Sequence, residues 1–453
     1  MARKPIAGGV AGAVAGGGDD AAPLPHDVGR VLSYLAHLLD ERIALRAEQS
    51  AEEFAAAHLG VGRGDVVTTT AVLSGLGFQL AALTLGGVLE SHPPVALVGE
   101  TPSDAPGYDM LELGAERLRI PNEVTAAFAA GAVAPCPLVV ALIPEDFRDR
   151  SVLSVHSRTA DADAARAWLD GLLERSRRDN PFRGRALEAV ATPAGLRFRI
   201  VDPPAVGRGD VVLPDGVWDE VDCNVHGLFA ALDHLAAAGL AENRGVLLAG
   251  PPGTGKTLLS RVLATEVPAG VTVVFCDGKA VAHAVRTLYA ELEHLAPALV
   301  VMEDIDLVVA DRHRGGGHST EALVDFLLAL DGAITRHRGV VTVATTNDPA
   351  AIDAAAKRAA RFDRVVDVPP PDAAGRAAIL TRYLRSVAGP VDAARVAAAT
   401  DGATGADLRE LVTLAVLHTS RPGASGPAGA VDTALLLRLA ADAGYRLPTG
   451  QYL

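Results

Sequence analysis

The octapeptide GPPGTGKT, Gly250–Thr257, has the residue types and spacing of a phosphate-binding loop. It fits the pattern G-x-x-x-x-G-K-[ST], with an apolar run before it and a helical run after it, which is the context the pattern requires. Gly253 and Gly255 permit backbone conformations that turn successive N–H groups toward phosphate oxygens. The N-terminus of the following helix adds partial positive charge. We therefore predict a loop that binds the phosphates of a nucleotide.

Two side chains of this loop carry specific roles. A lysine in the position of Lys256 reaches the β- and γ-phosphates, and a hydroxyl in the position of Thr257 ligates Mg²⁺. The alternative is a glycine-rich turn with a chance lysine, which the scarcity of lysine, four in 453 residues, disfavours. The predicted nucleotide-binding residues of the loop are Gly250, Pro251, Pro252, Gly253, Thr254, Gly255, Lys256, Thr257 and Leu258.

A second cluster of chemical groups follows the apolar run ALVVM, which ends in the acids Glu303 and Asp304. In parallel α/β sheets, ligands lie beyond the carboxyl ends of the strands, so these acids are expected beside the phosphate loop. Glu303 is then predicted to hold Mg²⁺ with its water shell, and Asp304 to orient or deprotonate the attacking water. The alternative is a strand that simply runs out into solvent.

The elements that must position these groups are visible as five apolar runs separated by helical stretches. Such a rhythm is typical of a parallel sheet covered on both faces. We predict an α/β nucleotide-binding domain over residues 215–372, followed by a helical lid over residues 373–453. The five runs are GVLLAG, VTVVFC, ALVVMED, VVTVATTN and RVVDVPPP.

The N-terminal half mixes helical and strand patterns without a catalytic signature. We predict an Ala/Gly-rich disordered tail over residues 1–27, an α+β domain over residues 28–150, and a small α+β segment with a linker over residues 151–214. The predicted fold class is therefore α/β, with an α+β region before the phosphate-loop domain.

An uncharged segment, Val66–Leu89, is 24 residues long and so long enough to span a bilayer. It contains four Thr, one Ser, one Gln and four Gly, and no cluster of Lys or Arg flanks it. We favour a buried strand followed by a helix, with a membrane segment as the alternative.

Composition narrows the class of partner. A net charge of −14 argues against binding to a nucleic-acid backbone, because neutralising phosphates requires a basic surface. Three scattered cysteines give no disulfide framework and suit a reducing compartment. We expect a cytoplasmic protein with no nucleic-acid partner and no membrane partner.

Several motifs together resemble the AAA family of ATPases over residues 215–445. GPPGTGKT resembles the Walker A motif, and VRTLYAELEHLAPALVVMEDID resembles the helix and Walker B segment. TVATTNDPAAID resembles the sensor 1 strand, which implies that Asn347 binds the γ-phosphate or the attacking water. WDEVDCNVHGL resembles the segment whose backbone touches adenine, near Val221 and Asp222, and GATGADLREL resembles the start of the lid helix beside the adenine and ribose.

The segment DAAAKRAARFDR is similar to the arginine-finger segment of the family, which puts Arg358 and Arg361 at the finger positions. Fingers of this family act on the γ-phosphate held by a neighbouring subunit. The resemblance thus implies a ring, a hexamer in the family, that acts on an unidentified protein client.

Two departures from the family pattern bear on activity. The family usually has Asp-Glu at the end of Walker B, whereas this chain has Glu303-Asp304, an order found in a smaller subgroup. The pore-loop segment FCDGKAVAHAVRTLY lacks an aromatic residue between Phe275 and Tyr289, so we expect no threading of unfolded chains. We predict Mg²⁺-dependent ATP hydrolysis that remodels or assembles a protein partner. The alternatives are an ATP-gated assembly platform with little turnover and a membrane-associated remodeller of folded proteins.

Overall fold

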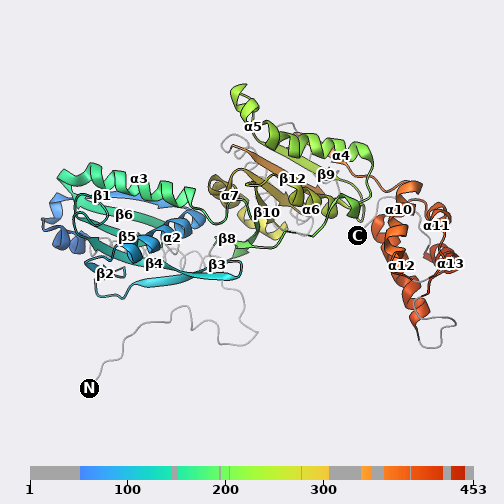
Figure 1. Cartoon of the computed structure of the whole chain (residues 1–453), viewed down its shortest axis with the longest axis horizontal. Helices are drawn as coiled ribbons and strands as arrows, with labels where there is room; N and C mark the ends of the chain where they lie inside the picture. Colours follow the sequence, from blue (N-terminus) through green and yellow to red (C-terminus); the bar gives the residue numbers. More distant parts are fainter. Residues whose placement is uncertain are drawn as a thin grey trace, which may run out of the picture.

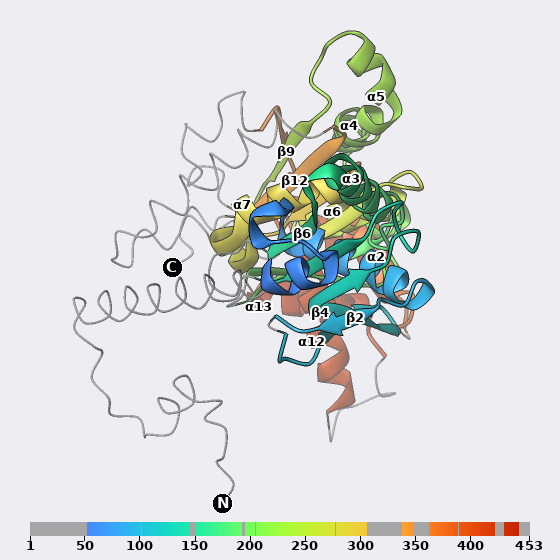
Figure 2. The ribbon, with the colours of Figure 1, turned by 90° about the vertical axis from the view of Figure 1, so that its left-hand side faces the viewer.

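The protein, for which we use a computed structural model, forms two β-sheets and a C-terminal group of helices arranged in a row (Figure 1). Figure 2 looks along this row from the N-terminal side, with the N-terminal sheet in front. The structure describes residues 52–100, 102–144, 151–192, 195–203, 205–276, 278–305, 338–347, 362–387, 389–421 and 430–443.

The N-terminal sheet is antiparallel, and in the described residues its strands follow the order β1-β6-β5-β4-β2, with β3 paired to β4. Helices α2 (Gly75–Ser91) and α3 (Ala162–Arg178) pack on one face, and helical residues 52–59 pack on the other. The strands are β1 (Val66–Leu73), β2 (Ala96–Val98), β3 (Gly107–Leu113), β4 (Glu116–Phe128), β5 (Leu138–Ile143) and β6 (Ser151–Arg158).

The uncharged segment Val66–Leu89 forms strand β1 and most of helix α2, as we favoured. Ser74 ends the strand and caps the helix, because its Oγ accepts a hydrogen bond from Gly77 N at 3.2 Å. Across the part of the chain that the structure describes, no helix combines the length and the apolar character needed to span a bilayer.

The segment predicted over residues 151–214 is divided between the two sheets. Its first strand, β6, pairs with β1 and β5, so the boundary between residues 150 and 151 does not separate two sheets. Its hairpin, β7 (Ala186–Thr192) and β8 (Gly195–Ile200), belongs to the second sheet, where β7 runs parallel to β10 (Thr272–Cys276). Sequence alone does not assign such partners, because strand pairing is set by contacts distant in the chain.

The second sheet has the order β13-β9-β12-β11-β10-β7-β8, and every neighbouring pair except β7 and β8 is parallel. This confirms the predicted α/β fold. The five apolar runs of the sequence form β9 (Arg244–Ala249), β10, β11 (Ala298–Met302), β12 (Val340–Thr346) and β13 (Arg364–Asp367).

Helices cover both faces of this sheet. α4 (Asp215–Val221), α5 (Gly227–Ala237) and α6 (Lys256–Glu266) share one apolar core with the strands, whereas α7 (Gly278–Leu295) packs on the opposite face. The strand residues alternate between the two cores: Val246 and Leu248 face the α6 side, and Leu247 faces the α7 side.

The core on the α7 side continues without interruption into the N-terminal region. Leu76 and Leu85 of α2 belong to the same cluster of buried residues as Leu288 and Leu292 of α7. Hairpin β7–β8 lies at this junction, where Phe198 packs against the same cluster. The N-terminal region is therefore bound to the second sheet by a shared apolar core.

The helical lid has a separate core. It consists of α10 (Ala373–Leu384), α11 (Ala393–Ala399), α12 (Gly405–Ser420) and α13 (Thr433–Ala443), and it lies at the far end of the row from the N-terminal region (Figure 1). All apolar residues of its cluster fall between residues 377 and 440. These helices complete the fold class predicted from the sequence.

Candidate active site

The phosphate loop connects strand β9 to helix α6. Gly253 and Gly255 have φ angles of 79° and 101°, which favour glycine. A Cβ on Gly250 would lie 2.2 Å from the carbonyl oxygen of Val368, so this position also has no space for a side chain. The glycines predicted from the motif are thus required by conformation and by close packing.

Lys256 begins helix α6, and its side chain is folded into the loop. Its Nζ donates hydrogen bonds to the carbonyl oxygens of Gly250 at 2.7 Å and Pro251 at 2.8 Å, and the residue is only 5% exposed. Thr254 closes the loop by donating from Oγ1 to Pro251 O at 3.0 Å. The ammonium group is therefore held inside the curve of the loop, where a phosphate would bind.

The rest of the loop is open to solvent. Thr257 lies half-buried in the first turn of α6, where its hydroxyl is available to a metal ion bound at the phosphates. Four other residues of the loop are exposed: Pro251, Pro252, Gly253 and Leu258.

The register of the parallel strands brings the predicted catalytic groups to the same edge as the loop. Ala249 of β9 pairs with Thr346 of β12, and Ala344 of β12 pairs with Met302 of β11. The three strands therefore end at the same edge of the sheet. The residues that follow them there begin at Gly250, Asn347 and Glu303. This register agrees with the expected position of Glu303 and Asp304, at the same edge as the phosphate loop.

Asp304 and Asn347 are bonded to each other. Asn347 Nδ2 donates to Asp304 Oδ1 at 3.2 Å, and the backbone N–H of Asp304 donates to Thr345 Oγ1 at 2.9 Å. Asp304 has a φ of 52°, an uncommon conformation for a residue other than glycine. Such strained positions cluster at functional sites, and here the hydrogen bonds hold the carboxylate in place.

Glu303 is half-buried directly after β11, and its backbone N–H donates to Cys276 O at 3.2 Å. Burial raises the pKa of the Glu303 carboxyl, the neighbouring Asp304 raises it further, and Arg261 opposes both. Arg261, one turn along α6 from Lys256, lies 3.7 Å from Glu303 through Nε and Oε1. The carboxylate predicted to hold the metal thus has a cation beside it.

The lid touches the loop through the start of α12. Thr404 caps this helix, and Ala406 N donates to Gly253 O at 3.3 Å. A Cβ on Gly253 would lie 2.7 Å from Thr404 Oγ1. The segment GATGADLREL is therefore beside the phosphate loop, where the family resemblance puts it.

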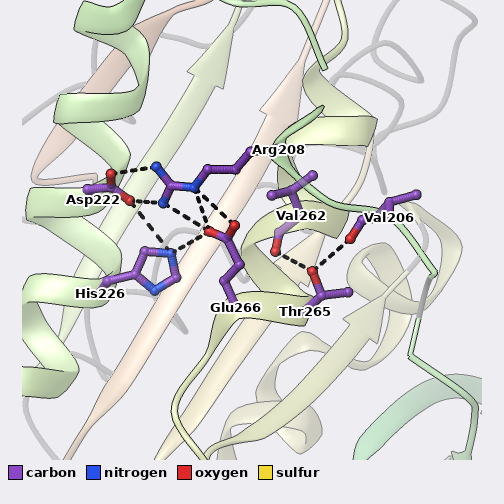
Figure 3. A network of polar contacts seen from close by, with 7 residues as sticks. All are labelled: Val206, Arg208, Asp222, His226, Val262, Thr265 and Glu266. Carbon is purple, nitrogen blue, oxygen red and sulfur yellow. Dashed lines mark hydrogen bonds and ion pairs between the residues drawn. The ribbon is translucent and has the colours of Figure 1, made fainter. Parts of the chain in front are cut away.

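The two residues whose backbone was predicted to contact adenine, Val221 and Asp222, lie at the C-terminal end of helix α4. Val221 is fully buried in the core on the α6 side, and Asp222 binds Arg208, which also binds Glu266 at the C-terminal end of α6 (Figure 3). Ten residues of helix, about 15 Å, separate Glu266 from Lys256 at the loop. The structure therefore does not bring the Asp222 carboxylate to the phosphate loop.

A different segment approaches the loop. Val211 Cγ1 lies 3.6 Å from the position of a Cβ on Gly255, and Val212 Cγ1 lies 3.7 Å from one on Gly375 of the lid. Sequence reasoning missed these residues because a pair of valines carries no signature of a ligand site.

The cluster of Asp222, His226 and Glu266 offers three ligand atoms within 4.8 Å of one another. Arg208 already binds both carboxylates, with Nη1 2.8 Å from Asp222 Oδ2 and Nη2 2.9 Å from Glu266 Oε2. The hydrogen bonds to Asp222 and Glu266 raise the pKa of Arg208, and the hydrogen bond from Arg208 lowers the pKa of Asp222. The cluster is an ion-pair network rather than a metal centre.

The predicted fingers Arg358 and Arg361 lie outside the described residues. The remaining groups fit a magnesium nucleotide, since the loop has a buried lysine, a helix N-terminus and glycines at positions with no space for a Cβ. An oxygen ligand set of the kind Mg²⁺ prefers is available from Thr257 and Glu303. Together the fold and this site define a P-loop nucleoside triphosphatase.

Comparison with known proteins assigns the nucleotide-binding domain to a family. Residues 246–370 match the model of the ATPase family associated with various cellular activities (AAA). These residues therefore form an AAA-type ATPase domain, as the sequence motifs predicted. An AAA domain binds ATP with Mg²⁺ and hydrolyses it.

Curated relatives support the same assignment. The ATP-dependent zinc metalloprotease FtsH 2 of Symbiobacterium thermophilum is 38% identical over 252 residues, which cover 51% of this chain and 42% of the relative. The i-AAA protease supercomplex subunit YME1 of Saccharomyces cerevisiae is 36% identical over 192 residues, covering 40% of this chain and 25% of the relative. The chain thus spans less than half the length of these relatives.

Proposed function

We propose that this chain couples ATP hydrolysis to the remodelling or assembly of a protein partner that binds its N-terminal region. The observation that carries the proposal is the apolar core shared by α2 and α7, which makes the N-terminal region and the nucleotide-binding sheet one mechanical unit. Hydrolysis would change the angle of the separately packed lid against this unit.

The residues of the site have complementary roles in this reaction. Lys256 binds the β- and γ-phosphates, and Thr257 and Glu303 would hold Mg²⁺, which supplies charge neutralisation to the phosphates. Asp304 accepts the proton of the attacking water, and Asn347 holds the Asp304 carboxylate through the 3.2 Å hydrogen bond. We further propose that the backbone near Val211, rather than Val221 or Asp222, contacts the nucleoside.

The mode of action differs from threading. Helix α7 begins at Gly278, two residues after strand β10 ends, so little chain separates them. Tyr289, the first aromatic after Phe275, is buried and hydrogen-bonded to Thr342 Oγ1 at 2.8 Å, so it is not a side chain that grips a client. The metalloprotease activity in the relatives' names is not part of the proposal, since no histidine of the chain is followed by glutamate as the H-E-x-x-H motif requires.

The proposed assembly is a ring, with six subunits by family resemblance, in which Arg358 and Arg361 act on the nucleotide of the neighbour. We further propose a cytoplasmic location, which is supported by three cysteines that form no disulfide. No nucleic-acid partner is proposed, in keeping with the net charge of −14.

A second candidate, an ATP-gated assembly platform with little turnover, is favoured by the acids at the end of β11. The shorter Asp304 occupies the general-base position, and Arg261 already pairs with Glu303. Steady-state phosphate release separates the two functions. Rapid release that Asp304→Asn abolishes supports the enzyme, whereas tight ATP binding without release in the unmodified chain supports the platform.

The partner itself is tested by affinity capture. Full-length Asp304→Asn protein with ATP should retain a client that Lys256→Ala protein does not retain, because only the former binds ATP without hydrolysing it. The unmodified protein with ADP serves as the control for the nucleotide state. Equal recovery of the same proteins by all three would contradict the proposal.

A further inference from the structure

A short turn, Arg208–Asp210, connects the lid to the nucleotide-binding core. On the lid side, Arg382 of α10 donates from Nη1 to Gly209 O at 2.5 Å and from Nη2 to Asp210 Oδ1. The other oxygen of Asp210, Oδ2, accepts from Gly207 N at 2.8 Å. The Asp210 carboxylate is thus fixed by its own turn and presented to the lid arginine.

The same turn is anchored to the core at the C-terminal end of α6. Arg208 binds Asp222 and Glu266, and Thr265 Oγ1 donates to Val206 O at 3.0 Å (Figure 3). Arg208 also lies over the ring of Trp218, 4.8 Å from its centroid. Residues 206–210 therefore move with α6 and α4 rather than with the lid.

Directly after this turn the chain passes between the phosphate loop and the lid. Val211 is beside Gly255 and Val212 is beside Gly375, as described above. A nucleoside held by the backbone of residues 211–212 would lie next to Asp210 and to Arg382, the lid residue that binds Asp210.

Within the described residues, the lid and the sheet have separate apolar cores. Among the residues that the structure describes, the apolar cluster of the lid is made of lid residues, and Ala406 N donates to Gly253 O of the phosphate loop. Asp210 and Arg382 are each about one-third exposed, with 35% of each side chain accessible. A charged contact at this position can open and close without unfolding either side.

We propose that the Asp210–Arg382 ion pair is a latch that positions the lid over the nucleoside and sets the rate of nucleotide release. This inference rests on the proposed nucleotide site and adds two positioning residues to it. Asp210 and Arg382 lie outside the phosphate loop and outside the acidic pair at the end of β11. Their effect is transmitted through segment 211–212, which adjoins Gly255 on one side and Gly375 on the other.

The test measures release of fluorescent mant-ADP from the full-length protein by stopped flow. Arg382→Gln and Asp210→Asn should each speed release about three- to tenfold, the range expected when a partly exposed ion pair is lost. The double variant should release no faster than the faster single variant, because both changes remove the same interaction. Arg382→Lys keeps the positive charge, so its release of mant-ADP should be slower than that of Arg382→Gln.

Arg385→Gln is the matched control. It removes the same charge from the same end of α10, and within the described residues its exposed side chain makes no hydrogen bond or ion pair. Added salt should speed release from the unmodified protein and from Arg385→Gln, but much less from Arg382→Gln. A merely structural role would lower thermal stability without this salt pattern.

The outcomes are distinguishable. Unchanged release in Arg382→Gln, equal acceleration by Arg385→Gln, or additive acceleration in the double variant would overturn the latch. Absence of mant-ADP binding by the unmodified protein would instead refute the nucleotide site on which the latch rests.

Discussion

The two regions that flank the nucleotide-binding sheet are attached to it in different ways. The N-terminal region shares a continuous apolar core with α7, and Glu291 of α7, only 1% exposed, accepts hydrogen bonds from Ser74 Oγ at 2.6 Å and Leu76 N at 3.2 Å. The lid has its own core and meets the sheet through backbone contacts and the Asp210–Arg382 pair. Motion driven by nucleotide is therefore expected on the lid side.

The largest expected effect comes from stopping the chemistry. Asp304→Asn should lower ATP hydrolysis about 10²–10⁴-fold, because the amide cannot accept the proton of the attacking water. Binding of ATP should remain, since Lys256 and the loop are unchanged. Phosphate release and mant-ATP titration check the two statements. Hydrolysis within twofold of the unmodified protein would assign the base elsewhere.

In the ATP-bound Asp304→Asn protein, hydrogen exchange compares the mobility of the lid with that of the α2–α7 junction. ATP should increase the protection of α10 and α12 in the lid against hydrogen exchange. It should leave the exchange rates of α2 and α7 unchanged. Exchange that changes at the α2–α7 junction but not in the lid would reverse the assignment of the moving region.

The second effect tests the shared core. Leu292→Ala should cost about 2–5 kcal/mol by leaving a cavity where α7 meets the N-terminal region. Leu292 is fully buried, and its cluster includes residues of both regions, so both should lose protection together. Leu411→Ala, at a fully buried position of the lid core, is the matched control and should loosen the lid alone. Hydrogen exchange and chemical unfolding give the two readouts. Loss confined to the second sheet in Leu292→Ala would show that the core is not shared.

Sequence predicted the second sheet well, for physical reasons that do not extend to the N-terminal region. Runs such as ALVVM are apolar at every position because both faces of a parallel sheet are covered, so they identify strands locally. The run SVLSVHSR likewise predicts a strand, but its partner β1 lies more than 70 residues away, and pairing of this kind leaves no local signal. The contact of Val211 with the phosphate loop was unpredictable for a related reason, since it depends on where the backbone passes.

The third effect uses pH to weaken one region selectively. His156 of β6 is buried, and burial lowers its pKa to about 4 from an ordinary value of 6.5. The folded protein therefore keeps this histidine neutral, and the stability it contributes is present above pH 6.5 and is lost as the pH falls toward 4. Between pH 7.5 and pH 5 the loss should be about 2 kcal/mol.

This pH effect should appear as faster hydrogen exchange in the N-terminal sheet and α7, with the lid as the internal reference. His156→Gln removes the titrating group and keeps a side chain that can hydrogen-bond Thr68 Oγ1, which lies 2.9 Å from His156 Nδ1. The selective loss at low pH should then shrink. A loss of equal size in the variant would assign the pH dependence to other groups.

The smallest effect concerns the polar contact at the junction. Ser74→Ala removes the N-cap of α2 and one donor to the buried Glu291 carboxylate, so it should cost about 1 kcal/mol. Asp392→Ala removes the N-cap of α11 in the lid, whose Oδ1 accepts from Arg395 N at 3.0 Å, and is the matched control. Hydrogen exchange at α7 should rise in the first variant and stay unchanged in the second. Ser74 links two regions, whereas Asp392 caps a helix within one region. If Ser74→Ala, like Asp392→Ala, changed exchange only around its own helix, the hydrogen bonds to Glu291 would add nothing to the coupling. The apolar core alone would then join the N-terminal region to the sheet.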